Sequence, residues 1–346
     1  YNFKKISFFK KNINFLFAPS SKKKHNKNFL TPLIWRFNEI TFLKKDAEFL
    51  IDQYYKKKAE YLWISYASNT YNLIKTIKKI DKKIKIISDT DSVFYKFIER
   101  ERPYLGLLKK VLNLIKTKYY KNIEKKIIEI SDITTCVSDY DRKIFEKFKL
   151  NKKIYIFRNV VDIPNVKSTK KNNKFTVILS GTFGSPNSPM NVSTNWFLNE
   201  IYPLIKYKIE NLKIFILGQN SEKYFKKMEN NQITVTGWVR DIKAYFTKSN
   251  LAIVPLKYES GTRFKILEAG SFKIPIISTY LGAEGLKVKD NHDILLEDDP
   301  KKFAKKIFNL YKGKKLRNKL ANNNYKLILR EYTIKSLIND AKKILN

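Results

Sequence analysis

The chain alternates short runs of apolar, often β-branched residues with longer segments in which apolar residues recur at helical spacing among lysines. Short apolar runs bounded by polar turns are typical of buried strands, and the longer segments are typical of amphipathic helices. Because the two kinds of segment alternate, the pattern predicts parallel sheets joined by crossover helices.

The first half of the chain is predicted to hold five strands and four helices. We expect strands at 14–18, 61–66, 83–88, 133–137 and 153–157, and helices at 46–57, 70–80, 107–130 and 138–148. Helix 107–130 is expected to keep its Leu, Ile and Tyr side chains on one side. Its lysine-rich side is then either a membrane-facing surface or a solvated face, of which the second is commoner.

A second alternating series follows the polar segment 164–173, which carries no apolar period and is the best linker candidate. Its strands are expected at 175–181, 213–217, 233–235, 251–256, 274–279 and 293–296, and its helices at 191–205, 222–230, 242–249, 263–272, 301–311 and 334–345. The pattern therefore predicts an α/β fold with an N-terminal domain over 1–165, a C-terminal domain over 174–333, and a last helix, 334–346, that packs back toward the first domain. Because the sequence begins with Tyr rather than Met, the first domain is expected to lack some N-terminal residues.

Composition excludes several classes of protein. The 346 residues are 43% hydrophobic, as in a folded chain, and no apolar run approaches the 18 residues of a transmembrane helix. The lone cysteine, Cys136, excludes an internal disulfide and suits a reducing compartment, so we expect a cytoplasmic protein. With only His25 and His292, a histidine-based metal site is not expected, and no cofactor is predicted.

The formal net charge of +38 indicates attraction to anions: a membrane surface, a nucleic acid or a phosphorylated substrate. The alternative is coding bias, since Lys, Asn and Ile are all abundant. The charge is spread over both halves of the chain, which argues against a dedicated nucleic-acid groove. Peripheral contact with the inner face of a membrane remains an expectation.

Two loops that follow predicted strands carry glycines. LSGTFGSPNSPMN holds Gly181 and Gly184, and TGWVRD holds Gly237. Ligands of open α/β sheets bind beyond the carboxyl ends of the strands, and glycine there allows close approach of a ligand to the backbone. Neither loop matches the dinucleotide fingerprint or the P-loop pattern.

The stretch YESGTRFKILEAGSFKIPIIST, residues 258–279, carries the most specific chemistry. A helix is predicted to open at Gly261 and Thr262. Because N–H groups at a helix start have no partner within the helix, those of Gly261 and Thr262 are expected to form an anion site. Arg263 and Lys265 fall in its first turn, where each cation costs up to about 1 kcal/mol unless an anion is present. Glu268 shares a helix face with Lys265, and the alternative to phosphate binding is a surface ion pair between them worth about 0.2–0.5 kcal/mol.

These residues resemble the donor-site signature of GT-B glycosyltransferases of group 1, family 4-like. The match comprises Pro255-Leu256, Gly261, Arg263, Lys265, Leu267-Glu268-Ala269, Pro275 and Gly282-Ala283-Glu284-Gly285, with Gly237-Trp238-Val239 and the Gly181 loop in order before them. Weaker similarity in IISDTDSVFYKFIERER, SDITTCVSDYDRKIF and FRNVVDI extends the resemblance over most of the chain from Lys83 to Glu331.

The resemblance implies the GT-B fold, in which two Rossmann-like doubly wound parallel-sheet domains face a central cleft, the first on the acceptor side and the second binding the donor. It implies retaining, metal-independent transfer of a sugar from a nucleotide-diphosphate sugar to a hydroxyl of a carbohydrate or lipid-linked acceptor, in synthesis of a polysaccharide, glycolipid or glycoprotein. Its implied donor contacts are Gly181, Thr182, Gly237, Trp238, Val239, Gly261, Thr262, Arg263, Lys265, Leu267 and Glu268. Among them, Arg263 and Lys265 would hold the diphosphate as catalytic cations, and Glu268 the ribose.

The sequence departs from the family pattern at three places. Ser260 stands where many members have a first Glu, Thr182 stands where many have an Arg, and Asp91 lies in the loop where many have a His. Asp91 is a candidate to accept or orient the acceptor's proton, and the alternative is that Asp89 or Asp91 only caps the following helix. An inert nucleotide-sugar-binding protein and a nucleotide-sugar 2-epimerase are the competing functions, and a nucleic-acid-binding protein rests on charge alone.

Overall fold

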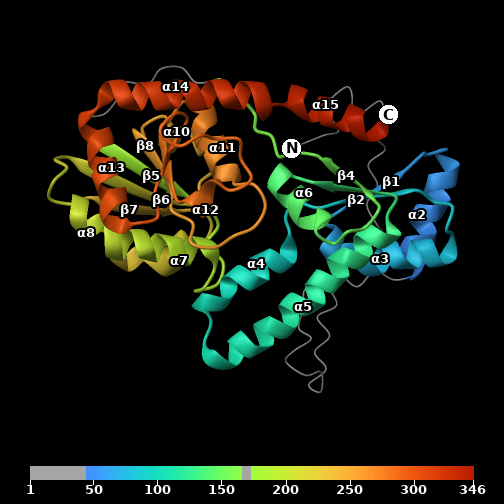
Figure 1. Cartoon of the computed structure of the whole chain (residues 1–346). Helices are drawn as coiled ribbons and strands as arrows, with labels where there is room; N and C mark the ends of the chain where they lie inside the picture. Colours follow the sequence, from blue (N-terminus) through green and yellow to red (C-terminus); the bar gives the residue numbers. More distant parts are fainter. Residues whose placement is uncertain (1–43, 166–172) are drawn as a thin grey trace. The chain divides into compact units, whose positions relative to one another are not determined.

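A computed structural model describes residues 44–165 and 173–346, so the strand predicted at 14–18 lies outside the described residues. The chain divides into two units (Figure 1). The first comprises the residues up to Glu99 together with Leu107–Phe157 and Ile338–Asn346, and the second comprises Arg100–Gly106 and Arg158–Leu337. The main division thus falls at Phe157 rather than at the predicted 165, and the last nine residues group with the first unit.

The first unit is built on a four-stranded parallel sheet in the order β1-β2-β3-β4. Its strands are β1 (Leu62–Ser65), β2 (Ile86–Asp89), β3 (Ile133–Cys136) and β4 (Lys153–Ile156), and its helices are α2 (Lys44–Lys56), α3 (Ala67–Ile80), α4 (Phe94–Glu101, which runs past Glu99 into the second unit), α5 (Leu107–Ile130) and α6 (Asp139–Glu146). Because the strands follow one another in a single direction, right-handed crossovers place α3 and α5 on the same face. There they bury Ile64 and Ile86 with Ile74 and Ile127.

The opposite face of this sheet is covered by the end of the chain. Ile344, in the last turn of α15 (Ile334–Leu345), is buried with Ile87 and Ile133 of β2 and β3. Strand residues alternate between faces, so Ile86 and Ile87 contribute to two separate cores. The C-terminal residues thereby complete a layer of the first unit.

The predicted orientation of helix α5 is wrong over its first turns. Its buried side chains include Asn113, Tyr120 and Glu124, whereas Leu107 and Leu108 are 83% and 85% exposed. The reason is local: Asn113 donates from Nδ2 to the carbonyl of Ile98 at 2.7 Å, and Glu124 accepts hydrogen bonds from the first turn of α4. Polar side chains therefore anchor the start of this helix, and the apolar side chains of its first turns face outward, whereas Ile123, Ile127 and Ile128 further along are buried.

The second unit is built on a six-stranded parallel sheet in the order β10-β9-β8-β5-β6-β7. Its strands are β5 (Phe175–Ser180), β6 (Leu212–Leu217), β7 (Ile233–Gly237), β8 (Leu251–Val254), β9 (Ile276–Ser278) and β10 (Leu295–Leu296). Its helices are α7 (Pro189–Trp196), α8 (Tyr202–Ile205), α9 (Ser221–Phe225), α10 (Lys243–Phe246), α11 (Phe264–Ser271), α12 (Tyr280–Ala283), α13 (Pro300–Lys312) and α14 (Lys314–Glu331).

The strand order of this sheet reverses between β5 and β8, which pair directly through Val177–Leu251 and Ile178–Ala252. From β5 the chain proceeds through β6 to β7 in one direction, and from β8 it proceeds through β9 to β10 in the other. Right-handed crossovers therefore place α7 and α11 on opposite faces. The loops after β5 and β8 consequently meet at a topological switch point, where open α/β sheets bind their ligands.

Helix α14 is the main element that the sequence pattern does not predict. Its sequence, KKLRNKLANNNYKLILRE, is so rich in Lys and Asn that its apolar stripe is narrow. Leu327 and Ile328 nevertheless pack with Leu267 of α11.

The predicted helix 191–205 is interrupted by a π-helical segment at Phe197–Ile201, ahead of Pro203. Among the described helices, none is long and apolar enough to cross a membrane.

Candidate active site

Three glycines lie side by side at the carboxyl ends of β5, β6 and β7. The Gly181 N–H donates to Leu217 O, and the Gly218 N–H donates to Gly237 O, both at 2.9 Å. Gly218 has φ +133°, and a Cβ there would sit 1.8 Å from the carbonyl oxygen of Gly181. This glycine, to which the sequence reading gives no role, allows the backbones of the loops after β5 and β6 to touch. The sequence feature that could have indicated this role is the position of Gly218 at the end of the apolar run KIFILG.

The Gly181 N–H is used by the sheet, so it is not available to a ligand. The next residue differs: the Thr182 N–H donates to no described residue, and the Thr182 side chain is exposed. Of the two predicted backbone contacts in this loop, Thr182 is therefore the one with a free donor.

The loop after β8 is held against the loop after β5 by Tyr258. Its side chain is 1% exposed, and its hydroxyl donates to the carbonyl of Asn187. Further along, Gly261 has φ +77°, and the Thr262 hydroxyl accepts from Asn159 Nδ2 at 2.7 Å. Sequence reasoning assigned no role to Tyr258 or Asn159, although each lies in a stretch that the sequence analysis singled out; both fix the path of the backbone toward helix α11.

Helix α11 begins at Phe264, so the prediction that it opens at Gly261 and Thr262 is wrong. The left-handed φ of Gly261 and the extended backbone of Arg263 (φ −87°, ψ 91°) are not helical, and Arg263 is the N-cap. The N–H groups of Phe264 and Lys265, in the first turn of the helix, donate to no described residue. Donors that could bind an anion are therefore free at this helix start, but they lie later in the chain than expected, and the anion site stays a prediction.

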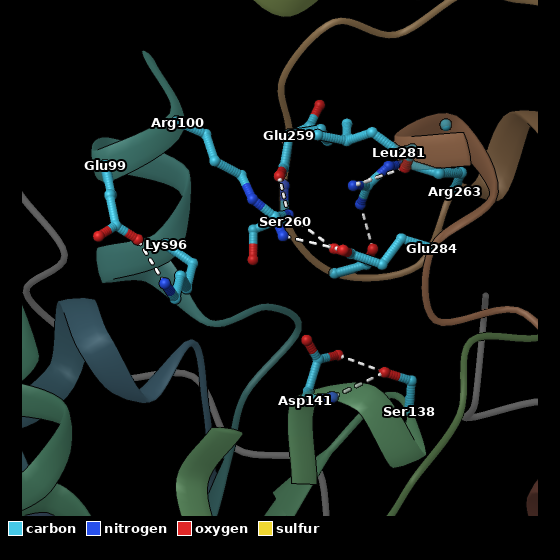
Figure 2. Close-up of polar contacts among 12 residues, drawn as sticks. Lys96, Glu99, Arg100, Ser138, Asp141, Glu259, Ser260, Arg263, Leu281 and Glu284 are labelled. Atoms are coloured by element: carbon cyan, nitrogen blue, oxygen red, sulfur yellow. Dashed lines mark hydrogen bonds and ion pairs between the residues drawn. The ribbon is translucent and has the colours of Figure 1, made fainter. Parts of the chain in front are cut away.

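The Arg263 guanidinium is directed at backbone rather than at solvent. The residue is 3% exposed, and its side chain donates to the carbonyls of Gly261 and, at 3.3 Å, Leu281 (Figure 2). It thereby fixes the loop before α11 and the start of α12. Its charge still acts at the site, because it contributes to lowering the pKa of Lys265.

Lys265 is the cation best placed to meet a ligand. Its Cε atom would be 2.7 Å from a Cβ at position 181, so its side chain lies across the Gly181 backbone. Desolvation lowers the pKa of Lys265, with a further contribution from Arg263, while Glu259 and Glu268 oppose the shift. Among the described residues, none accepts a hydrogen bond from this ammonium or forms an ion pair with it. An anion at this point would replace the hydration that the ammonium has lost.

Glu268, one turn further along α11, is partly buried, and its carboxylate likewise accepts no hydrogen bond from a described residue. Desolvation raises its pKa. No Lys265–Glu268 ion pair forms, although the two residues are three apart on the helix. The alternative of a surface pair, left open by the sequence, is therefore excluded.

The turn after β7 combines a constrained glycine with an exposed aromatic ring. Gly237 has φ +69°, and a Cβ there would meet the Glu222 carboxyl at 2.6 Å. Trp238 is 71% exposed, whereas Val239 packs against the core. Leu267 is 1% exposed and packs with Leu327 and Ile328, so it positions α11 and offers no surface to a ligand.

The segment Gly282-Ala283-Glu284-Gly285 is tied down by Arg100. Its guanidinium binds both carboxylate oxygens of Glu284, at 2.6 and 2.9 Å, and donates to the carbonyl of Glu259 at 2.8 Å (Figure 2). Such two-point pairing fixes geometry as well as charge. Arg100 thus braces the loop before α11, a role for which the sequence offered no signal.

In the first unit, Asp89 and Asp91 follow β2. Asp89 accepts from Thr135 Oγ1 at 2.6 Å and Ser65 Oγ at 3.1 Å, so its carboxylate is used within the sheet. Neither aspartate caps helix α4, and that alternative is wrong. Glu124 accepts from the N–H groups of Phe94 and Tyr95 instead, at 2.8 and 3.1 Å. Burial raises the pKa of Glu124 to about 8, although these two N–H groups lower it.

Asp91 is the exposed carboxylate of this loop, and the partner that the structure gives it is the Ser92 hydroxyl at 3.5 Å. Desolvation raises its pKa. Within residues 44–165 and 173–346, no three His, Cys, Asp or Glu side chains converge to hold a metal ion.

Two parallel-sheet α/β units, one with candidate anion-binding groups at the switch point of its sheet, are typical of the GT-B fold, and comparison with solved structures agrees. The chain superposes on a glycosyltransferase from Rickettsia africae with a TM-score of 0.64 and 15% identity, covering 86% of this chain and 79% of that one. It superposes on the Anabaena protein HepE in complex with UDP with a TM-score of 0.66 and 11% identity, covering 87% and 82%.

The chain therefore has the GT-B fold of two parallel-sheet α/β domains, and part of it matches a family of glycosyltransferases. Residues 174–313 match the family described as Glycosyl transferases group 1, and these residues include every predicted donor contact. A Klebsiella pneumoniae protein described as an uncharacterized 44.6 kDa protein in the cps region is 22% identical over 289 residues, or 79% of this chain and 71% of that one.

Proposed function

We propose that the protein transfers a sugar from a nucleotide-diphosphate sugar to an acceptor hydroxyl, with retention of configuration and without a metal ion. The observation that carries the proposal is Lys265, a desolvated ammonium without a protein partner among the described residues, lying across the Gly181 backbone at the switch point. A diphosphate is an anion that such a site fits, since the N–H groups of Phe264 and Lys265 in the first turn of α11 also have no described acceptor.

In this reaction the bond between the sugar's anomeric carbon and the diphosphate oxygen breaks, and the acceptor oxygen bonds to that carbon. The electron pair of the broken bond goes to the diphosphate, whose growing charge needs stabilising. Lys265 and the start of α11 supply positive charge there, and the buried Arg263 adds a fixed charge behind them. Two cations and a helix terminus thus do the work that a metal ion does elsewhere.

Four of the other predicted contacts, Glu268, Trp238, Gly237 and Thr182, take the rest of the donor. The Glu268 carboxylate, one helical turn from Lys265, accepts hydrogen bonds from the ribose hydroxyls. The exposed Trp238 ring and the Gly237 turn border the base, since an aromatic face stacks on a nucleobase. Thr182 offers its free N–H to the diphosphate in place of the Arg that other members carry.

Asp91 remains a prediction as the group that accepts or orients the acceptor's proton. The contacts after β2 support this role. The Asp89 carboxylate accepts hydrogen bonds from the Thr135 and Ser65 hydroxyls, whereas Asp91 is exposed. We place the reaction in the cytoplasm on the strength of the lone, buried Cys136. The Klebsiella relative's description, in the cps region, favours a surface polysaccharide or a lipid-linked precursor as acceptor.

The test is a thermal-shift screen of the full chain against UDP-, GDP-, ADP-, CMP- and dTDP-sugars. A bound donor at a hundredfold excess over its Kd adds about 2.7 kcal/mol of stability. UDP-sugars come first, because HepE was solved with UDP. Product made with the cognate donor is then examined by NMR for anomeric configuration and with excess chelator for metal dependence. Conversion of the donor, incubated alone, into an epimeric nucleotide sugar would indicate the epimerase alternative, and loss of transfer with chelator would refute metal independence.

A further inference from the structure

The start of helix α5 presents apolar side chains to solvent. Leu107, Leu108, Val111, Leu114 and Ile115 are 83%, 85%, 59%, 45% and 50% exposed. At 3.6 residues per turn, positions 107, 108, 111, 114 and 115 fall on one side of the helix. Isolated exposed apolar residues are ordinary, whereas five neighbouring ones mark a surface that meets something.

This orientation is built into the first unit. The opposite side of the helix carries Asn113, Tyr120 and Glu124, all buried. Asn113 holds the second turn of α5 through its bond to Ile98 O, and Glu124 caps α4. Turning the apolar residues inward would expose the cap and leave the buried polar groups without these partners, which is costly. The apolar side is therefore fixed outward.

The same outward side becomes basic further along the helix. Lys118, Lys121 and Lys125 follow Leu114 at intervals of four, seven and eleven residues, and all three are exposed. Lys125 also forms a solvent-exposed ion pair with Glu129 at 3.8 Å, an interaction of little strength. We call this surface, from Leu107 to Lys125, the outer face of α5: two apolar turns followed by a row of lysines.

We propose that the outer face of α5 docks on an anionic membrane surface. Its two apolar turns enter the boundary between headgroups and acyl chains, and its lysines lie on the anionic headgroups. An apolar patch continued by cations is the combination that such a surface binds, because apolar burial and attraction to anionic lipid add together. No helix needs to span the bilayer for this contact.

A second copy of the chain is the principal competing occupant. Charge argues against it: each chain carries a formal charge of +38, and pairing two outer faces brings their lysine rows together. An anionic surface is instead attracted by the whole molecule before the apolar turns make contact. The proposal is independent of sugar transfer, because binding to vesicles is measured without any nucleotide.

The test is co-sedimentation of the full chain with vesicles of phosphatidylcholine containing about one quarter phosphatidylglycerol, compared with phosphatidylcholine alone. We expect binding to the anionic vesicles that weakens with salt. The triple variant Leu107→Ser, Leu108→Ser, Val111→Ser should bind at least about tenfold more weakly. Lys118→Gln with Lys121→Gln should weaken binding about fivefold per lysine. Unchanged binding by the triple variant overturns the proposal.

Matched controls remove the same groups elsewhere. Leu329→Ser and Tyr207→Ser take away exposed apolar side chains, and Lys301→Gln with Lys305→Gln takes away exposed charge on α13; none should change binding. A dye attached at Leu108→Cys reports directly, because the native Cys136 is buried. Its emission should shift to the blue only when anionic vesicles are added. A blue-shifted dye before vesicles are added, or a dimer that the triple variant abolishes, would show that the chain itself covers this face and would overturn the proposal.

Discussion

Replacing Lys265 by methionine separates binding of the donor from stability of the fold. Methionine keeps an unbranched apolar stem of similar length and removes only the ammonium. In the structure that ammonium has no hydrogen bond or ion pair with a described residue, and desolvation lowers its pKa from 10.5. A lowered folded-state pKa means that the charged form destabilises the fold at neutral pH, and that stability rises as the pH passes upward through that pKa. Lys265→Met should therefore leave the free energy of unfolding unchanged or raise it.

Binding of the donor should change in the opposite sense. A hydrogen bond between charged partners is worth about 1.5–3 kcal/mol, and each 1.4 kcal/mol corresponds to a factor of ten in Kd. The Kd for the nucleoside diphosphate should accordingly rise about tenfold to a hundredfold. In the unmutated protein the affinity should also decline on the alkaline side at a pH below the ordinary lysine pKa of 10.5, as Lys265 loses its proton.

The assay is isothermal calorimetry with UDP, paired with urea unfolding of the same preparations. Lys273→Met is the control, since Lys273 lies just after α11 with its ammonium 4.5 Å from the Tyr325 ring centroid, away from the anion site. It removes the same charge and should leave the Kd unchanged. A Lys265→Met protein that binds UDP as well as the unmutated protein, or that loses stability with its affinity, would refute the assignment of this ammonium to the donor.

Three further predictions concern single side chains. Glu268→Gln should weaken UDP binding about tenfold and abolish the preference for UDP over its 2′,3′-dideoxy analogue, with stability unchanged or higher because burial raises the pKa of Glu268; a retained preference in calorimetry would contradict its role at the ribose. Gly218→Ala should cost at least about 2 kcal/mol in urea unfolding, because a Cβ there lies 1.8 Å from Gly181 O at φ +133°; a cost below about 1 kcal/mol would argue against the tight contact of the two loops. Burial raises the pKa of Glu331, but hydrogen bonds and charges around it, including Arg158, lower it to about 2 overall. Its contribution is thus present above pH 4.5 and lost as the pH falls toward 2, so Glu331→Gln should lower stability at pH 7 by about 2 kcal/mol and flatten the acid limb of unfolding; equal acid limbs for both proteins would contradict it.

The positions of the strands could be predicted from the sequence because each is a short apolar run between polar turns. β5 and β6, for example, begin and end within a residue or so of the predicted ranges. Parallel strands buried on both faces have this pattern whatever their neighbours are. Helix α14 could not be found in this way, because Leu327 and Ile328 gain their burial from α11, a contact between segments far apart in the chain.

At the candidate site, the sequence predicted which residues take part, but it predicted the role of each residue only in part. Arg263 and Lys265 are equal cations in the sequence, two residues apart. The left-handed Gly261 turns the backbone so that Arg263 reaches two carbonyls, while Lys265 is left against Gly181 without a partner among the described residues. Which of two neighbouring cations is structural depends on backbone dihedrals, which a motif does not record.

Helix α5 shows the same limit on a larger scale, and it explains why its orientation was predicted wrongly. Hydrophobic periodicity assumes that the apolar side of a helix is the buried side. Here Asn113 and Glu124 satisfy backbone groups at the two ends of α4, so burying them is favourable despite their polarity. Once those two contacts are made, helix geometry alone forces Leu107, Leu108 and Val111 outward. The outward apolar surface on which the membrane proposal rests is therefore set by buried hydrogen bonds and not by the apolar pattern.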